Sequence, residues 1–463
     1  MGFRHILCAA VICAATPAAA QTLSEAIAAA YATNPEAAAA RAVVRQIDEE
    51  APLALSGMRP SVGLSGSASQ VLNDRFGDVG RIWNGGVTLS QPVYEGGRVR
   101  ASVSAADARI AAAQARLVAV EQAVIVDTVA AYADVLKSQA VVELNANQVR
   151  VLERELQASR DRFEVGDVTR TDVAQSEARL SAARAELSLA RGQLVTVQQA
   201  YRRLVGRLPG DLAPLPPLPP LPDAAESARV TAVEYNPGLI AARFDEQAAL
   251  ADVRAAKAQA RPSVGVSATA QYTHFDRYGS GDSGFNPEIG VSASLPLFTG
   301  GAIAARVRQA QARQSEMLEH IARAERLTTE AAVGSFTLVE TADAVITSAR
   351  TQVSANELAA EGVRQENAVG SRDILDVLNA EQELLNARVL LVEAERDKYV
   401  AAFQLLEAMG QADVVLASAP VSRYDSAANS RRVRGKWGEF SYDPDPRQDR
   451  ERNHAPAPVF GPQ

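Results

Sequence analysis

The sequence predicts an α+β membrane protein built from two tandem repeats, each with long coiled-coil helices and a two-strand β-hairpin. Three observations support this prediction. Nearly identical phrases recur in the two halves, long proline-free stretches carry a seven-residue apolar spacing, and shorter segments alternate apolar residues with small polar ones. An internal repeat determines the organisation of the whole chain, so it takes precedence over local patterns.

The repeated phrases keep the same order in both halves of the chain. RPSVGLSGS, from position 59, corresponds to RPSVGVSAT from 261, and SQPVYEGGRV corresponds to SLPLFTGGAI. Each half also has an Asn-Pro pair before the first phrase and a VG turn after the second. We therefore expect a first repeat at 21–208 and a second at 223–416. The segment between them, 209–222, reads PGDLAPLPPLPPLP and is expected to be a semi-rigid spacer rather than a packed element.

Both ends of the chain are expected to lie outside the repeats. Residues 1–20 have the features of a secretory signal peptide: a weakly basic start, an apolar stretch and small residues at the cleavage site. Both cysteines, Cys8 and Cys13, lie in this segment, so no disulfide, thiolate nucleophile or zinc–cysteine site is expected in the mature chain. Residues 417–463 are charged and dotted with proline, which favours a disordered tail.

Composition argues against several functional classes. The chain has 55 Asp and Glu against 47 Lys and Arg, so it has no basic field to attract nucleic acid. After the signal segment, no apolar run reaches the about twenty residues of a membrane-spanning helix. The remaining histidines, His274, His320 and His454, are scattered and lack a nucleophile elbow, metal spacing or phosphate-binding loop. We therefore expect no enzyme activity, no metal site and no cofactor.

A single long helix is predicted from Val99 to about Phe163, because this stretch is free of proline and rich in alanine. At about 1.5 Å per residue, its length is on the order of 95 Å. An apolar residue recurs every seven positions with one four-residue step, which is typical of a coiled coil with a stutter. This stripe comprises Val103, Ile110, Leu117, Val124, Val135, Val142, Val149, Leu156 and Phe163, and the second repeat keeps Val307, Ile321, Val339, Ile346 and Val353.

Each long helix is expected to turn sharply and to be followed by a shorter returning helix. Gly166 suits a left-handed helix end, and Thr169 or Ser371 can cap the next helix. A further helix precedes the strand phrase in each repeat, starting near Pro35 and Pro237. The returning helices carry Val173, Leu180, Leu187, Leu194 and Tyr201 in the first repeat, and Val377, Leu384, Leu391 and Leu405, interrupted by Lys398, in the second.

Two β-hairpins are predicted, at about 60–93 and 262–297, because apolar and small polar residues alternate there with period two. The expected apolar face of the last strand comprises Ile289, Val291, Ala293, Leu295 and Leu297. Hydrocarbon cannot satisfy open strand edges, and membrane barrels begin at about eight strands. If these strands lie in a membrane they must close into a barrel, and four strands are too few to do so. Several copies of the chain are therefore expected to contribute strands to one barrel.

These phrases together resemble the TolC-type outer-membrane efflux and secretion family, over Gln21 to about Leu416. The opening TLSEAIAAAYATNPEAAAARA, RPSVGLSGS, SQPVYEGGRV and the two VG…DV…A…L…A…L runs carry the resemblance. It implies a homotrimer that pools twelve strands into one barrel in the outer-membrane lipid, with an α-helical tube extending into the periplasm. A periplasmic adaptor and an inner-membrane transporter of the ABC or RND type are the implied partners.

The resemblance also assigns candidate residues to two places. The strand-to-helix junctions would comprise Pro92, Gly96, Gly97, Pro296, Gly300 and Gly301, where proline ends ladder pairing and glycine permits the bend; plain strand termination predicts the same residues. At the VG turns, Arg372 matches the family's gate arginine, Thr171 and Asp172 match its partners, and Asp376 matches a carboxylate ring. Alternatively, Asp172 and Asp373 are simply favourable acids in a first helical turn.

The sequence departs from the family pattern at the gate. Asn367 stands where the family has a gate tyrosine, and Asn379 stands where it has a second aspartate ring. A weaker lock and a single selectivity ring are therefore expected. As the function we favour an exit duct for protein secretion by a type I system. The alternatives are a multidrug or metal efflux channel with a proton-driven pump and, from another class, a periplasmic adaptor or coiled-coil structural protein.

Overall fold

The computed structural model describes residues 20–73, 78–277, 280–417, 419–445 and 447. The predicted signal peptide lies outside these ranges except for its last residue. The described residues form two compact units. One unit comprises the residues up to 41 together with 115–242 and 320–424, and the other comprises 42–114, 243–319 and the residues from 425 on.

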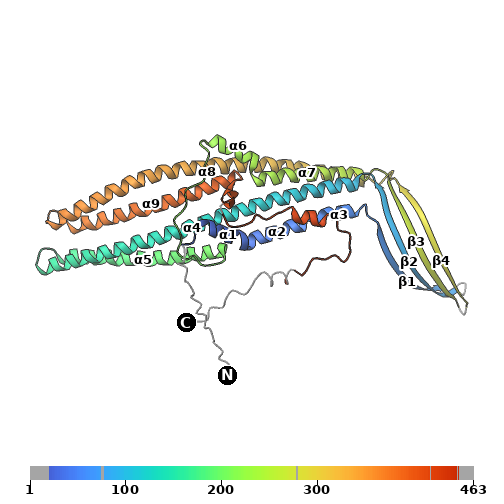
Figure 1. Cartoon of the computed structure of the whole chain (residues 1–463), viewed down its shortest axis with the longest axis horizontal. Helices are drawn as coiled ribbons and strands as arrows, with labels where there is room; N and C mark the ends of the chain where they lie inside the picture. Colours follow the sequence, from blue (N-terminus) through green and yellow to red (C-terminus); the bar gives the residue numbers. More distant parts are fainter. Residues whose placement is uncertain (1–19, 74–77, 278–279, 418, 446, 448–463) are drawn as a thin grey trace, which may run out of the picture. The chain divides into compact units, whose positions relative to one another are not determined.

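Long helical hairpins dominate the first unit, as the sequence predicts. The long helix of each repeat has 67 residues, and a shorter helix returns beside it (Figure 1). The hairpins are formed by α4 (Arg98–Glu164) with α5 (Arg170–Val205), and by α8 (Ala302–Ala368) with α9 (Ile374–Ala408). The remaining helices are α1 (Leu23–Thr33), α2 (Pro35–Asp48), α3 (Glu50–Ser56), α6 (Ala225–Tyr235), α7 (Pro237–Ala258), the 3₁₀ helix η1 (Ala412–Ala417) and α10 (Ala428–Val433).

The predicted apolar stripes are buried over most of their length. Val124, Val135 and Leu156 of α4 are buried, and Tyr132, Tyr201 and Phe403 lie at the centre of the first unit's core. Phe163 is an exception, because it is half exposed at the last turn of α4. Lys398, which interrupts the stripe of α9, forms an ion pair with Asp343 of α8.

The Asn-Pro pairs perform the same structural task in both repeats. Asn34 and Asn236 end α1 and α6, and the following prolines begin α2 and α7. The Asn34 amide donates to the carbonyl of Leu204 at the end of α5, and that of Asn236 donates to Ala408 at the end of α9. Each asparagine thereby satisfies a carbonyl that the helix end leaves open.

The linker at 209–222 is packed, so the prediction of an unpacked spacer is wrong. Its leucines contact the core around Tyr132, whose hydroxyl lies 2.6 Å from the carbonyl oxygen of Ala213. A polyproline II segment has three residues per turn, so leucines at every third position share one face. The leucines in question are Leu212, Leu215, Leu218 and Leu221.

The predicted disorder of 417–463 does not hold for residues 419–445. Residues 419–424 belong to the first unit. From 425 on, the segment contains α10 and is part of the second unit, where Arg434 makes a two-point ion pair with Asp107. Asn429 is buried and donates to the carboxylate of Asp48 at 2.8 Å. Of the charges that favoured disorder, Arg434 is paired with an acid outside the segment, while Arg431, Arg432 and Lys436 pair with Asp425 and Asp443 within it. Residues 446 and 448–463 lie outside the described ranges.

The strands form one antiparallel sheet in the order β1-β2-β3-β4 (Figure 1). The first hairpin, 61–95, continues two residues past the predicted 60–93, and the second, 263–294, ends three residues before the predicted 297. Within this sheet, β1 and β4 are the edges. The strands are β1 (Ser61–Asn73), β2 (Asp78–Glu95), β3 (Ser263–Arg277) and β4 (Ser280–Ser294).

The strand-to-helix junctions contain glycines with left-handed backbones, while the two prolines differ in role. Gly96 and Gly97 follow β2 with φ of 65° and 87°, and Gly300 and Gly301 precede α8 with φ of 61° and 84°. Pro296 follows the end of β4, as predicted. Pro92 does not end ladder pairing, since β2 continues past a bulge to Glu95. Pro92 has no N–H to donate, and no hydrogen bond is lost on the β1 side, because the pairing of β2 with β1 ends at Ser90.

Replacing Gly96 by alanine is predicted to destabilise the protein much more than replacing Gly300. Both positions need a left-handed backbone, which costs a non-glycine residue about 1–2 kcal/mol. At Gly96 a Cβ would also lie 2.7 Å from the carbonyl oxygen of Ala258, whereas at Gly300 it would meet nothing within 4 Å. Thermal unfolding of Gly96→Ala and of the matched Gly300→Ala variant tests this difference. Equal melting temperatures would contradict it.

Candidate functional site

One face of the sheet is apolar and exposed. The strand register aligns Val62 with Leu89, then with Ala268 and Ile289, so an apolar row crosses the sheet. A second row joins Leu64, Val87, Ala270 and Pro287. The exposed fractions of Leu64 and Ile289 are 84% and 82%, although both side chains are large and apolar. A continuous surface of this kind normally marks a lipid or protein contact.

Aromatic side chains border the apolar rows at the loop end of the same face. Trp83 of β2 pairs with His274 of β3, and Tyr272 of β3 pairs with Phe285 of β4. From Val264 to Tyr272 there are nine residues, about the number that a tilted strand needs to cross a bilayer. An outward apolar band bordered by aromatic residues is the surface pattern of membrane strands.

The opposite face of the sheet is polar and carries small side chains. A row of Gly63, Thr88, Thr269 and Glu288 crosses it. Thr273 donates to the side-chain oxygen of Asn84 at 3.0 Å, and this asparagine in turn donates to Ser67. One face therefore suits lipid and the other suits water.

The two helical turns of the first unit are built alike. Gly166 and Gly370 adopt φ of 82° and 76°, and the residue after each donates its N–H to the carbonyl oxygen five positions upstream. Thr169 caps α5, as predicted, through a reciprocal capping box with Asp172. Asp373 caps α9, so the prediction of Ser371 as the cap is wrong. The Ser371 hydroxyl instead donates to the carbonyl oxygen of Glu366.

The predicted gate residues are brought together only in part. Arg372 pairs with Glu366 at 2.9 Å and with Asp376 at 3.4 Å, and all three side chains are about half exposed. Asp172 accepts hydrogen bonds from Thr169, within its own helix start. Thr171, between them in sequence, is exposed on the first turn of α5. Within one chain, Asp172 therefore acts as a favourable acid in the first turn of α5. Arg372 and Asp376 form a local ion pair at the turn between α8 and α9.

The two asparagines that depart from the family pattern connect the repeats. Asn367 is buried, accepts a hydrogen bond from Arg162 of α4 and donates to the carbonyl oxygen of Arg372, both at 2.8 Å. Asn379 of α9 accepts from Arg179 of α5 at 2.8 Å. Both positions therefore hold polar bridges between the first and second helical hairpins.

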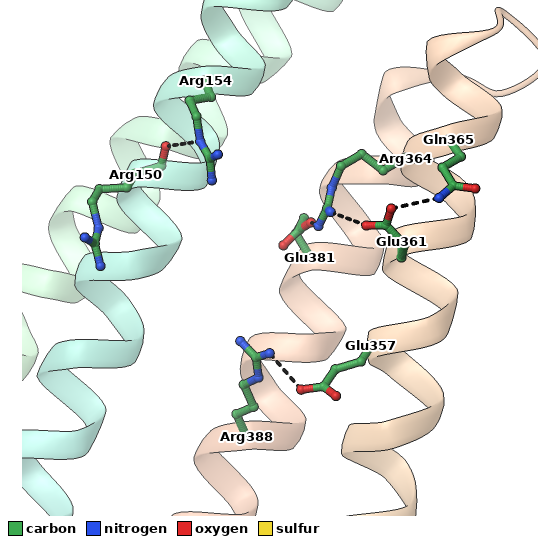
Figure 2. Close-up of polar contacts among 8 residues, drawn as sticks. All are labelled: Arg150, Arg154, Glu357, Glu361, Arg364, Gln365, Glu381 and Arg388. Carbon is green, nitrogen blue, oxygen red and sulfur yellow. Dashed lines mark hydrogen bonds and ion pairs between the residues drawn. The ribbon is translucent and has the colours of Figure 1, made fainter.

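A charged cluster with one buried member lies near the turn between α8 and α9, and sequence reasoning missed it. Arg364 of α8 binds Glu381 of α9, whose side chain is 5% exposed, and also Glu361 (Figure 2). Glu155 of α4 faces the same group, and burial raises its pKa although Arg364 opposes this shift. The sequence does contain one sign of this cluster. Glu381 lies between Val377 and Leu384 of the apolar stripe of α9, where a charged residue needs a partner.

An open groove of about 610 Å³ runs along α5 and α9 in the same unit. Leu189, Leu385 and Leu390 contribute apolar surface, and Glu186 and Glu393 are its acidic members. Amide side chains of Asn145, Gln193, Gln382 and Asn386 complete much of the lining. The groove offers an apolar floor with negative charge and hydrogen-bonding groups.

None of the helices in the described part of the chain is both long and apolar enough to cross a membrane. Among the same residues, no group of three or more His, Cys, Asp or Glu side chains could hold a metal ion.

The partly buried Glu155 gives a prediction about pH. Because burial raises the pKa of Glu155 above its ordinary value of 4.5, the folded state takes up its proton more readily than the unfolded state. Wild-type protein should therefore gain stability relative to Glu155→Gln as the pH falls through the raised pKa, and the gain should level off below 4.5. Melting temperatures of both proteins across this range test the sign. A constant difference would show that Glu155 does not titrate abnormally.

Comparison with known proteins identifies the family. The family model described as outer membrane efflux protein matches residues 26–207 and 229–411, one match per repeat. The outer membrane efflux protein BepC of Brucella suis is 31% identical over 441 residues, covering 94% of this chain and 96% of the relative. The alkaline protease secretion protein AprF of Pseudomonas aeruginosa is 29% identical over 331 residues, covering 66% of each chain.

The fold has a counterpart among solved structures. The outer membrane protein VceC of Vibrio cholerae superposes with a TM-score of 0.73 at 24% identity, covering 84% of this chain and 96% of that one. The family match excludes the alternative of a periplasmic adaptor, and it agrees with the expectation of no enzyme activity and with the resemblance seen in the sequence. With its paired matches over both repeats, the chain belongs to the outer membrane efflux protein family and is a protein of the outer membrane.

Proposed function

We propose that three copies of this chain combine their sheets into one twelve-strand barrel and form the exit duct of a tripartite export system. The main support for this proposal is the four-strand sheet, which has an exposed apolar face and two open edges, β1 and β4. In hydrocarbon each unpaired backbone N–H or C=O costs several kcal/mol. Pairing β4 of one copy with β1 of the next removes both edges, and three copies exceed the about eight strands at which barrels begin.

The helices of the same trimer would form the tube in the periplasm. Each long helix leaves large apolar side chains exposed in the single chain, among them Val118 of α4 and Leu338 and Leu358 of α8. Packing between copies would cover such residues. The groove along α5 and α9 is the proposed site for a helical segment of the adaptor, since its apolar floor and acidic members suit a helix with apolar and basic residues.

For the cargo we favour protein secretion with an ABC-type transporter, on the match of SQPVYEGGRV and the similarity to AprF, which is named for alkaline protease secretion. Efflux of small molecules with a proton-driven pump is the second candidate, supported by the name of BepC, which covers more of the chain. The partner transporter distinguishes them. Crosslinking in cells, followed by purification of the duct, should retain an ABC transporter in the first case and a proton-driven pump in the second.

The protein purified in this experiment also tests whether the duct is a trimer. A trimeric duct should run as a heat-resistant oligomer from the outer-membrane fraction. A monomer from the soluble fraction would contradict the shared barrel.

At the periplasmic end we propose that Asp376, Arg372, Asp172 and Thr171 take part in the gate. Three copies of Asp376 around a narrow opening would produce a negative field that attracts cations and repels anions. Arg372 would hold each carboxylate through the observed contact of 3.4 Å while also binding Glu366. Asp172 and Thr171 at the start of α5 would face this group across the opening.

Removing the charge of Asp376 is predicted to lower cation selectivity. In planar bilayers under a salt gradient, Asp376→Asn should shift the reversal potential towards zero, because the carboxylate ring is lost. Glu340→Gln removes the same charge from an exposed position of α8, many turns away from the gate. It should leave the reversal potential close to that of the wild type. Equal reversal potentials for Asp376→Asn and wild type would exclude the proposed ring.

A further inference from the structure

An aromatic loop, residues 437–442, extends from the segment that packs on the second unit. Within six positions it carries Trp437, Phe440 and Tyr442, whose exposed fractions are 68%, 88% and 79%. Aromatic residues make up only 5% of the chain, so three exposed ones in so short a stretch are a marked concentration. The described chain leaves most of the surface of these three side chains uncovered.

Ion pairs fix the loop at its base. Asp443 makes a two-point ion pair with Arg432 at 2.7 Å and lies 3.4 Å from the ammonium group of Lys436. The Arg432 guanidinium holds the pKa of Asp443 well below its usual range, so the pair stays ionised. Ser441 donates its backbone N–H to the carbonyl oxygen of Gly438 and tightens the loop.

The loop is anchored directly before the first strand of the sheet. Arg59, two residues ahead of β1, donates to the carbonyl oxygen of Lys436 at 2.8 Å and to that of Arg434 at 3.3 Å. Its guanidinium also lies 5.5 Å from the centre of the Trp437 ring. Trp437 is therefore held at the helix end of β1, where the apolar row begins with Val62.

The position matches the known preference of aromatic side chains in membranes. Trp and Tyr concentrate at both boundaries between hydrocarbon and water. The chain has two tryptophans. Trp83 lies in the aromatic border at the loop end of the apolar face, and Trp437 is attached at the opposite end of the strands.

We propose that the aromatic loop inserts into the boundary between headgroups and acyl chains of the leaflet next to the helices. This inference rests on the proposed function, because it needs the sheet to lie in a bilayer. Continuity with the lipid-facing sheet indicates lipid as the partner. The contact is made by aromatic side chains rather than by charge, since Arg432 and Lys436 bind Asp443 and Arg434 binds Asp107.

The two tryptophans allow a direct test. The full-length protein is purified from the outer membrane and reconstituted into phosphatidylcholine vesicles that contain lipid brominated at a shallow acyl position. Trp83→Phe leaves Trp437 as the only tryptophan, and Trp437→Phe leaves Trp83 as the matched control. Bromine quenches tryptophan only at short range, so both variants should lose a comparable fraction of their fluorescence. Quenching of Trp437 should be the same at low and high salt.

Other outcomes separate this inference from the proposed function. If Trp83 is quenched but Trp437 is not, the sheet lies in lipid and the loop proposal fails. Accessibility of Trp437 to acrylamide would then place the loop in water, and shielding from acrylamide would place it against a neighbouring copy. If neither tryptophan is quenched, the membrane position of the sheet fails as well. Loss of Trp437 quenching at high salt would show a charge-driven contact and overturn the aromatic one.

A second variant guards against a local effect at Trp437 itself. In the Trp83→Phe background, replacing Phe440 and Tyr442 by serine removes most of the loop's apolar surface without touching its ion pairs. Quenching of Trp437 should fall, and the heat-resistant oligomer should persist. Unchanged quenching would contradict insertion of the loop as a unit.

Discussion

The hydrogen-bonding demand of open strand edges in hydrocarbon determines much of what this chain can be. Strands β1 and β4 each leave one row of N–H and C=O groups unpaired, while the face between them is apolar and exposed. In water such an edge would invite aggregation, and in lipid it is not tolerated. The sheet therefore requires other copies before it can serve as a membrane element. Assembly and membrane insertion are two aspects of the same requirement.

The two repeats of the chain build the same helical hairpin and β-hairpin, and they differ where their long helices end. The Asn-Pro pairs, the left-handed glycines and the 67-residue helices are repeated almost unchanged. The copies diverge at the ends of the long helices, where half-exposed Phe163 corresponds to buried Asn367. Asn367 accepts a hydrogen bond from Arg162 of the first hairpin and donates to the carbonyl oxygen of Arg372 in the turn before α9, so this residue links the two hairpins.

Periodicity made most of the fold predictable, because burial follows directly from a repeat of seven or of two. The long helices, the Thr169 cap, the hairpins and the family could all be read from the sequence. Long-range polar partners could not. The pairing of Arg364 with Glu381, of Asn367 with Arg162 and of Arg434 with Asp107 depends on which elements meet in space. The packed linker was missed for another reason: its leucines repeat every three residues, a period that belongs to polyproline II rather than to helices or strands.

The two faces of the sheet also limit where a closed state can arise. The polar face carries mainly Gly, Ser and Thr, whose side chains are too small to fill a wide lumen. Barrels of about eight strands are just filled by their side chains, and larger ones leave a channel. A twelve-strand wall with such an interior would stay open. In the proposed duct, closure would then come from the helical turns, where Arg372, Asp376 and the bridging asparagines make polar contacts. The sheet would form the permanent opening, and the turns would carry the gate.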